Sequence, residues 1–172
     1  SSYGYFLVLI GTRAGTALTD GTENVYIGYE SGMFTTGAYE NIGIGAYSLR
    51  SHIDGASNLA IGRSAMYNNT DGNYNVAVGW QSMLSGTSGN QNTAVGTQTL
   101  REVTANNNSA FGYEAGMNIT TGTQNLALGH NAGLTLTTGL QNVLVGTNTN
   151  CSASSQNSVA IGYNVVATAS NE

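Results

Sequence analysis

The chain has 172 residues, and only 8 % of them are charged, against about 25 % in ordinary globular domains. It has four Arg, no Lys, no Pro and a net charge of −5, so it lacks the clustered cations that bind nucleic-acid phosphates. No apolar run approaches about 18 residues and no basic segment precedes an apolar one, so we expect neither a transmembrane helix nor a signal peptide.

One pentapeptide recurs along the whole chain. A degenerate copy, LVLIG, starts at Leu7, and nine clear copies follow, from NVYIG at Asn24 to SVAIG at Ser158. The ten copies start at residues 7, 24, 41, 58, 75, 92, 108, 125, 142 and 158. The spacing is 17 residues in seven of nine cases and 16 in the other two. No composition break interrupts the series, so we predict one repeat domain over residues 1–172.

A second half-motif follows each pentapeptide glycine. A small residue comes three positions later, then a larger apolar residue, then a polar turn that often contains glycine. The small residues are Ser31, Ser48, Ala65, Ser82, Thr99, Ala115 and Ala132. The larger residues are Met33, Leu49, Met66, Met83, Leu100, Met117 and Leu134. The turn glycines are Gly21, Gly37, Gly55, Gly72, Gly89, Gly122 and Gly139.

The alternation within each repeat predicts an all-β fold. Branched residues stand at positions two and four of the pentapeptide and Ala usually at position three, which indicates a strand with two different faces. The second half-motif is also compatible with a strand, so we expect two strands of about five residues in each repeat. Seventeen residues cannot form a core alone, but stacked repeats can. We therefore predict a parallel β-roll or β-solenoid of about ten 16–17-residue coils, roughly 48 Å long.

The repeated Asn and Gly residues are expected to have a structural role in the stacking of the coils. Stacking places identical residues above one another, so Asn ladders and apolar columns follow. The predicted structural residues are Asn24, Asn41, Asn58, Asn75, Asn92, Asn108, Asn125, Asn142, Gly28, Gly45, Gly62, Gly79, Gly96, Gly112, Gly129, Gly146 and Gly162. A coil this thin leaves one of its two apolar columns facing water, and burial against other copies of the chain is the simplest remedy.

Two segments resemble a known family. SVAIGYNVVATAS, from Ser158 to Ser170, resembles the head repeat of YadA-like trimeric autotransporter adhesins. GYEAGMNITTGTQNLALG, from Gly112 to Gly129, is similar to the variant in trimeric tail-fibre and fibre-shaft proteins of phages and bacteria. The resemblance covers nearly the whole chain and implies a left-handed β-roll, a homotrimer and an extracellular fibre. The repeat is longer than that of the adhesin heads, and the chain has no anchor barrel or heptad stalk, so we expect a fragment of a longer fibre protein.

The residues that often carry catalysis or bind metals form no such pattern. His52 and His130 occupy different repeat positions, and we expect both to be surface residues. Cys151 stands alone in a glycine-free turn, where nothing nearby would lower its pKa. Asp20, Asp54 and Asp71 each precede a turn glycine, which is a common turn pair as well as a candidate calcium ligand. We predict no enzyme, no cofactor and no metal.

The position after each pentapeptide glycine carries the candidate ligand surface. Its residues are Tyr29, Ala46, Arg63, Trp80, Thr97, Tyr113, His130, Thr147 and Tyr163. Rings beside polar groups suit sugars, and the candidate ligand residues are Tyr29, Trp80, Gln81, Tyr113 and His130. The alternative is that these rings shield sheet edges or pack between chains. Thr35-Thr36, Thr120-Thr121 and Thr137-Thr138 raise a weaker alternative, ice binding.

The sequence thus predicts a non-catalytic module of an extracellular fibre, from a phage tail fibre or a bacterial surface adhesin. Its expected partners are two further copies of the chain and a host or cell-surface receptor, for which a glycan is the candidate. We expect neither nucleic-acid binding nor membrane insertion by this segment. The alternative is a ligand-binding β-solenoid that takes glycans or, less readily, ice.

Overall fold

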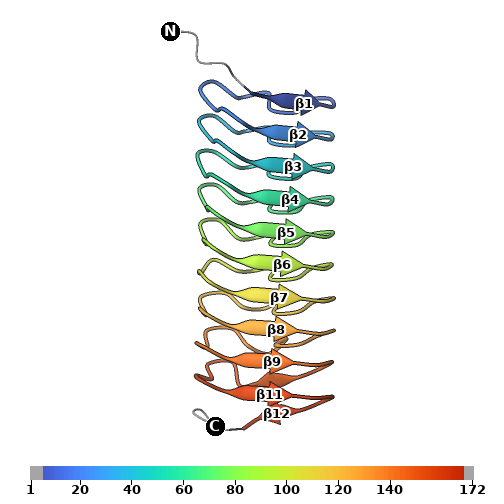
Figure 1. Cartoon of the computed structure of the whole chain (residues 1–172), viewed down its shortest axis with the longest axis vertical. Coiled ribbons are helices and arrows are strands. Elements are labelled where there is room, and N and C mark those ends of the chain that lie inside the picture. The colour runs from blue at the N-terminus through green and yellow to red at the C-terminus, as the bar shows by residue number, and fades with distance from the viewer. Residues whose placement is uncertain (1–5, 169–172) are drawn as a thin grey trace.

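The structure contains short strands of two or three residues, most of which stack in one sheet. The computed structural model describes residues 6–168 (Figure 1). The strands of the main sheet are β1 (Val8–Ile10), β2 (Val25–Ile27), β3 (Ile42–Ile44), β4 (Leu59–Ile61), β5 (Val76–Val78), β6 (Thr93–Val95), β7 (Ser109–Phe111), β8 (Leu126–Leu128), β9 (Val143–Val145) and β11 (Val159–Ile161). A short pair, β10 (Asn150–Cys151) and β12 (Val166–Ala167), forms a second sheet.

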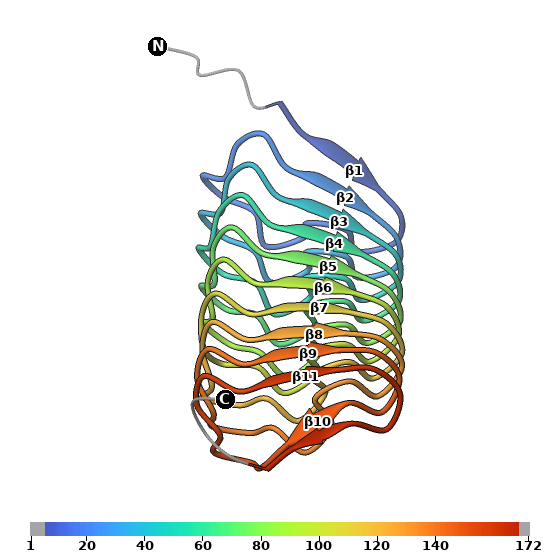
Figure 2. The same cartoon turned by 60° about the horizontal axis from the view of Figure 1, so that its bottom comes forward.

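The main sheet confirms the predicted β-solenoid. Its ten strands lie in chain order, and every neighbouring pair is parallel. Each strand begins one residue after a predicted repeat start, including the two repeats of 16 residues. The register joins equivalent residues, such as Ala60 with Ala77 and Ala77 with Ala94. Each coil therefore repeats the one before it, and the coils form a rod (Figure 2). The described residues contain no helix that could cross a membrane.

The prediction of a second strand in each repeat was wrong. Most of the second half-motif is turn, apart from β10, β12 and the bridges Tyr39–Ala56 and Leu140–Gln156. The reason is backbone conformation, because 23 described residues other than glycine have positive φ. Leu49, Met66, Met83 and Leu100 all have φ between 47° and 52°, which no extended strand allows. Backbone hydrogen bonds such as Met66 N–H to the Ser82 carbonyl still join successive coils there.

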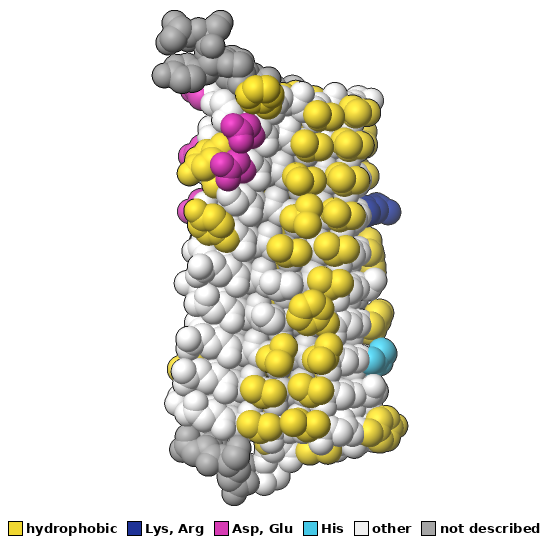
Figure 3. Space-filling model, viewed as in Figure 1, with side chains coloured by type: hydrophobic (Ala, Val, Ile, Leu, Met, Phe, Trp, Pro, Cys, Tyr) yellow, Lys and Arg dark blue, Asp and Glu magenta, His cyan; other side chains and the backbone are white. Residues whose placement is uncertain are grey.

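The centre of each strand faces the interior of the coil. Ala60, Ala77 and Ala94 are fully buried, whereas the branched residues on either side of them point outward. The space-filling view shows these outward residues as two apolar columns along the rod (Figure 3). The structure therefore decides which column the coil itself buries, namely the Ala column.

The interior is filled by complementary sizes across the coil. Where the strand centre is Ala, as at Ala60 and Ala77, the opposite wall supplies the buried Met66 and Met83. Where the centre is Tyr26, the opposite residue is Gly32, and a Cβ on Gly32 would lie 2.6 Å from the Tyr26 ring. A large residue on one wall therefore requires a small residue on the other, because a close-packed interior has no spare volume.

The Asn residues form a continuous buried ladder. The Oδ1 of Asn58 accepts hydrogen bonds from the Asn75 backbone N–H at 3.0 Å and the Asn75 Nδ2 at 3.1 Å. The Asn75 Nδ2 also donates to the Gly89 carbonyl at 2.7 Å. The same pattern runs from Asn24 to Asn142, so each amide ties its coil to the neighbouring coils. The pentapeptide glycines form a parallel column with φ between 125° and 137° from Gly28 to Gly162.

Candidate interaction surface

The strands present one face to solvent, which we call the apolar face. It consists of the first and last residues of the ten strands of the main sheet. Alternation requires this, because the middle residue of each three-residue strand points inward and its two neighbours point outward. Several of these residues are at least a third exposed, among them Ile10, Phe111, Leu128 and Ile161, the last at 64 %. The chain by itself leaves two columns of mostly branched side chains in water, and Thr93 and Ser109 interrupt one of them (Figure 3).

Two further columns border the apolar face. The leading edge lies two residues before each strand and consists of Glu23, Glu40, Ser57, Tyr74, Gln91, Asn107, Gln124, Gln141 and Asn157. The trailing edge lies two residues after each strand and is the column from Tyr29 to Tyr163 singled out above. Every leading-edge residue has φ between 53° and 61°, so each lies where the chain turns into the strand. A leading-edge residue and a trailing-edge residue of one coil are six positions apart, a span of at most about 20 Å.

Four of the predicted ligand residues lie in the trailing edge and the fifth, Gln81, directly follows it, but they do not converge on one point. Trp80 is 46 % exposed and lies two coils from Tyr113. The rings of Tyr113 and His130 stack at 5.2 Å with planes 14° apart. Tyr29 meets the Tyr47 ring edge-on at 5.3 Å. The Gln81 Oε1 accepts a hydrogen bond from the Gln98 Nε2 at 3.1 Å. No enclosed pocket occurs in residues 6–168, so a ligand would bind to an open surface.

His52 is inside the coil, which corrects the expectation that it is a surface residue. The side chain is fully buried, and its Nε2 lies 2.8 Å from the Gly55 carbonyl. That contact makes Nε2 the protonated nitrogen and leaves Nδ1 buried without a partner. Desolvation by burial lowers the pKa of His52, so the ring is neutral at pH 7. His130, by contrast, is exposed, as expected.

The other candidate chemical groups do not assemble. No cluster of three or more His, Cys, Asp or Glu side chains that could hold a metal occurs in residues 6–168. Asp54 accepts a hydrogen bond from the Thr36 hydroxyl at 3.2 Å, and Asp71 from the Thr70 hydroxyl at 3.0 Å. Cys151 lies buried in β10, where desolvation raises the pKa of its thiol. A raised thiol pKa opposes nucleophilic chemistry, which requires the thiolate.

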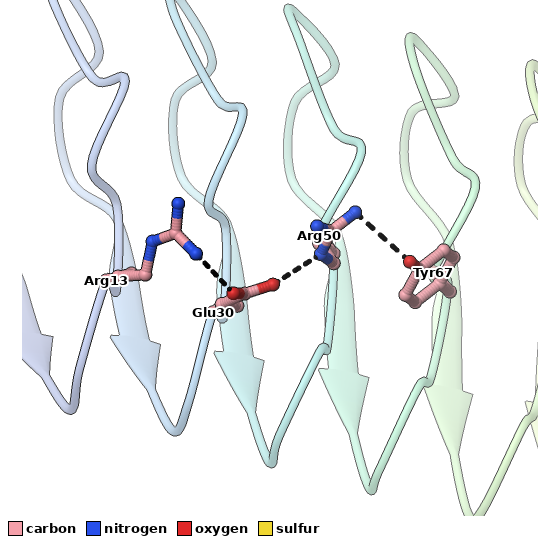
Figure 4. Close-up of polar contacts among 4 residues, drawn as sticks. All are labelled: Arg13, Glu30, Arg50 and Tyr67. Atoms are coloured by element: carbon pink, nitrogen blue, oxygen red, sulfur yellow. Dashed lines mark hydrogen bonds and ion pairs between the residues drawn. The ribbon is translucent and has the colours of Figure 1, made fainter.

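A charged network near the N-terminal end was not predicted. Arg13 Nη1 contacts Glu30 Oε1 at 2.9 Å, and Arg50 Nε contacts Glu30 Oε2 at 2.7 Å (Figure 4). Arg50 Nη1 donates to the Tyr67 hydroxyl at 3.1 Å, and the Arg50 guanidinium lies 4.8 Å from the centre of the Phe34 ring. The hydrogen bond from Arg50 is the largest cause that lowers the pKa of Glu30. The network links four successive coils, and its signal in the sequence is the spacing of 17 between Arg13 and Glu30 and between Arg50 and Tyr67.

A column of single Thr residues was also missed. It consists of Thr19, Thr36, Thr70, Thr87, Thr104, Thr120 and Thr137, and Ile53 interrupts it. The Thr70 hydroxyl donates to the Thr87 carbonyl one coil away at 3.1 Å, and the Thr104 hydroxyl to the Thr120 carbonyl at 3.2 Å. Within the predicted pairs, Thr35 is buried. The Thr hydroxyls therefore serve as rungs between coils.

The comparisons with known proteins found no match. No protein-family model matches the chain. No curated protein matches it either, and neither does any solved structure.

Proposed function

We propose that this chain is a shaft or head segment of an extracellular attachment fibre, assembled as three parallel copies around one axis. The apolar face lies at the centre of the assembly, and the opposite walls of the coils face solvent. The role is mechanical and adhesive: the rod provides length, and three chains with repeated coils multiply weak contacts with a receptor. The repeat resemblance to trimeric adhesin heads and tail-fibre shafts supports the copy number and the extracellular role.

The observation that carries this proposal is the apolar face, which runs along the sheet and is interrupted only at Thr93 and Ser109 among the strands described. Ten strands at about 4.8 Å per step make it about 43 Å long. Together with the leading and trailing edges the surface is at most about 20 Å wide, which gives an area on the order of 850 Å², close to what one partner contributes to a stable interface. Burial against identical faces removes branched side chains such as Ile61 and Val78 from water.

Solution mass tests the proposal directly. Light scattering on the purified 172-residue chain is expected to give three times the chain mass of 17.7 kDa. The mass should not fall when salt is raised, because apolar burial is not screened. A stable monomer of 17.7 kDa with the circular dichroism of a β-protein would overturn the fibre assembly.

The exposed rings of the trailing edge favour a second candidate, glycan binding. Tyr29, Trp80 and Tyr113 are each more than 40 % exposed, and aromatic faces stack on sugar rings. A glycan array should then give a signal that Trp80→Ala removes. A signal that survives this substitution, or no signal at all, contradicts glycan binding at Trp80.

A further inference from the structure

We propose that the two edges of the apolar face form the seam between neighbouring chains, so that each trailing-edge side chain meets the leading-edge side chain of the same coil in the next copy. The inference rests on the proposed function, because it requires parallel chains around one axis. It adds the register of the contact and the residues that make it. The partner at this surface is a second copy of this chain.

Rotational symmetry sets the register. Parallel copies related by rotation about an axis along the rod keep every residue at the same height. Such an arrangement is head-to-tail around the ring, so the trailing edge of one chain faces the leading edge of the next. Each coil therefore meets the equivalent coil of the next chain. A shift by one coil between neighbouring chains is excluded, because the ring of chains could not close.

The small residues of the trailing edge support this register. Each of the three small residues lies in the same coil as a long leading-edge side chain. The pairs are Ala46 with Glu40, Thr97 with Gln91, and Thr147 with Gln141. Within one chain the two members lie on opposite sides of the strand, at most about 20 Å apart. Inside the chain Glu40 Oε2 accepts a hydrogen bond from the Ser57 hydroxyl at 2.7 Å, which does not involve Ala46. A same-coil contact between chains accounts for the small residue at Ala46.

The short residues of the leading edge show the reverse match. Ser57 shares its coil with Arg63, and Asn107 shares its coil with Tyr113. A shift that moves each trailing-edge residue to the following coil would instead pair Ala46 with Ser57, which leaves an unfilled gap. Same-coil pairing fills these gaps, because close-packed interfaces alternate large and small side chains.

One coil brings two large rings together. Trp80 and Tyr74 belong to the coil of β5, and they are 46 % and 64 % exposed. Paired across the seam, each ring is covered by the other, and Trp and Tyr are enriched among residues that dominate interfaces. This contact and glycan binding at Trp80 exclude each other. We therefore place the anchor of the seam at the contact between Trp80 of one chain and Tyr74 of the next.

Disulfide formation measures the register. In a Cys151→Ala background, Gln91→Cys is combined with Thr97→Cys in the same coil or with Tyr113→Cys in the coil after. A third variant combines Thr97→Cys with Asn107→Cys, which tests the opposite shift by one coil and leaves Trp80 in place. The two cysteines within one chain are too far apart to bond, because a disulfide needs Cα atoms within about 7 Å. Under mild oxidation the same-coil variant should form covalent trimers, closed by a ring of three disulfides, several-fold faster than the other two.

Light scattering on each reduced variant separates the two proposals. A trimer in which an off-coil pair links faster than the same-coil pair overturns the register. A trimer in which none of the three pairs links shows that the edges do not meet. A monomer in the unsubstituted chain overturns the proposed function instead. Should Thr97→Cys disturb assembly, Gln141→Cys with Thr147→Cys repeats the same-coil test at other coils.

Discussion

At the scale of single residues, the fold depends on backbone conformations that few residue types tolerate. Gly79 has φ of 134°, and a Cβ there would lie 2.3 Å from the Gly96 carbonyl oxygen. Both features exclude any side chain, which explains why the pentapeptide ends in glycine in every copy. The leading-edge positions have φ near 57° and carry no β-branched residue, consistent with the cost of a left-handed backbone for Val, Ile or Thr.

The buried neutral His52 makes stability depend on pH. Its pKa is lowered in the folded state by burial, so the unfolded chain binds the proton more readily. Stability is therefore intact above the unfolded-state pKa of about 6.5 and falls as the pH drops below it, by up to about 1.4 kcal/mol per pH unit. Melting temperatures at pH 7.5 and pH 5.0 measure this loss.

His52→Asn is the matched variant for this measurement. The equivalent residue one coil on is Asn69, whose Oδ1 accepts the Gly72 N–H at 2.8 Å, so the column accommodates an amide. The variant should lose less stability between the two pH values than the unsubstituted chain. Equal losses would show that His52 does not titrate on unfolding.

At the scale of elements, each coil is held to its neighbours by polar ladders as well as by packing. The Asn75 Oδ1 accepts hydrogen bonds from the Asn92 N–H at 2.9 Å and the Asn92 Nδ2 at 3.3 Å, inside a region without solvent. A buried donor without its acceptor costs about 1–3 kcal/mol. The hydrogen bonds of the Asn side chains therefore stabilise the three-residue strands in addition to the strands' own few backbone hydrogen bonds.

Removal of one amide should weaken the rod measurably. Asn75→Ala leaves the Asn92 N–H and the Gly89 carbonyl without the partners described above. We expect the melting temperature to fall by about 5 °C or more, since each kcal/mol shifts it by about 2–4 °C in a chain of this size. Asn68→Ala, at an exposed position, is the control and should change little. Equal melting of the two variants would mean that the ladder contributes no stability.

At the scale of the whole molecule, the chain is a rod with a well-filled interior and an apolar face that stays exposed to solvent. Small strand centres and Leu or Met from the opposite wall fill the coil, and the branched residues remain outside. Charged residues are confined to the first two thirds of the described chain, up to Glu114. The remaining walls are mostly polar, so the apolar face is the surface that the proposed assembly would bury.

A charge on the apolar face should separate the copies without unfolding the chain. Val78 points outward from β5, so Val78→Glu leaves the interior of the coil intact. In the assembly, however, unpaired carboxylates would meet near the axis, at a cost of several kcal/mol per buried charge. Light scattering should give 17.7 kDa with an unchanged circular dichroism spectrum. Thr87→Glu, outside the apolar face, adds the same charge and should leave the assembly intact; a trimeric Val78→Glu would place the axis elsewhere.

The positions of the strands could be predicted from the sequence, but the environment of many individual side chains could not. The pentapeptide spacing placed all ten strands of the main sheet, because in-register stacking requires equivalent residues to recur at a fixed interval. The second half-motif was misinterpreted, since Leu49 and Met66 are apolar residues that a strand would also contain, and only the backbone shows them to be left-handed. His52 and the network around Glu30 were missed for a similar reason, because their environment comes from other coils.

The sequence by itself therefore determined the period, the strand positions and the existence of two unlike strand faces. Only the tertiary structure decided which face lies inside. Alternation along a strand is symmetric, so it distinguishes two faces without assigning either to the interior. The cross-section of the coil breaks this symmetry. Where the opposite wall supplies a buried Met, as at Met66 and Met83, the strand centre is a small residue, so the branched residues face outward and form the apolar face.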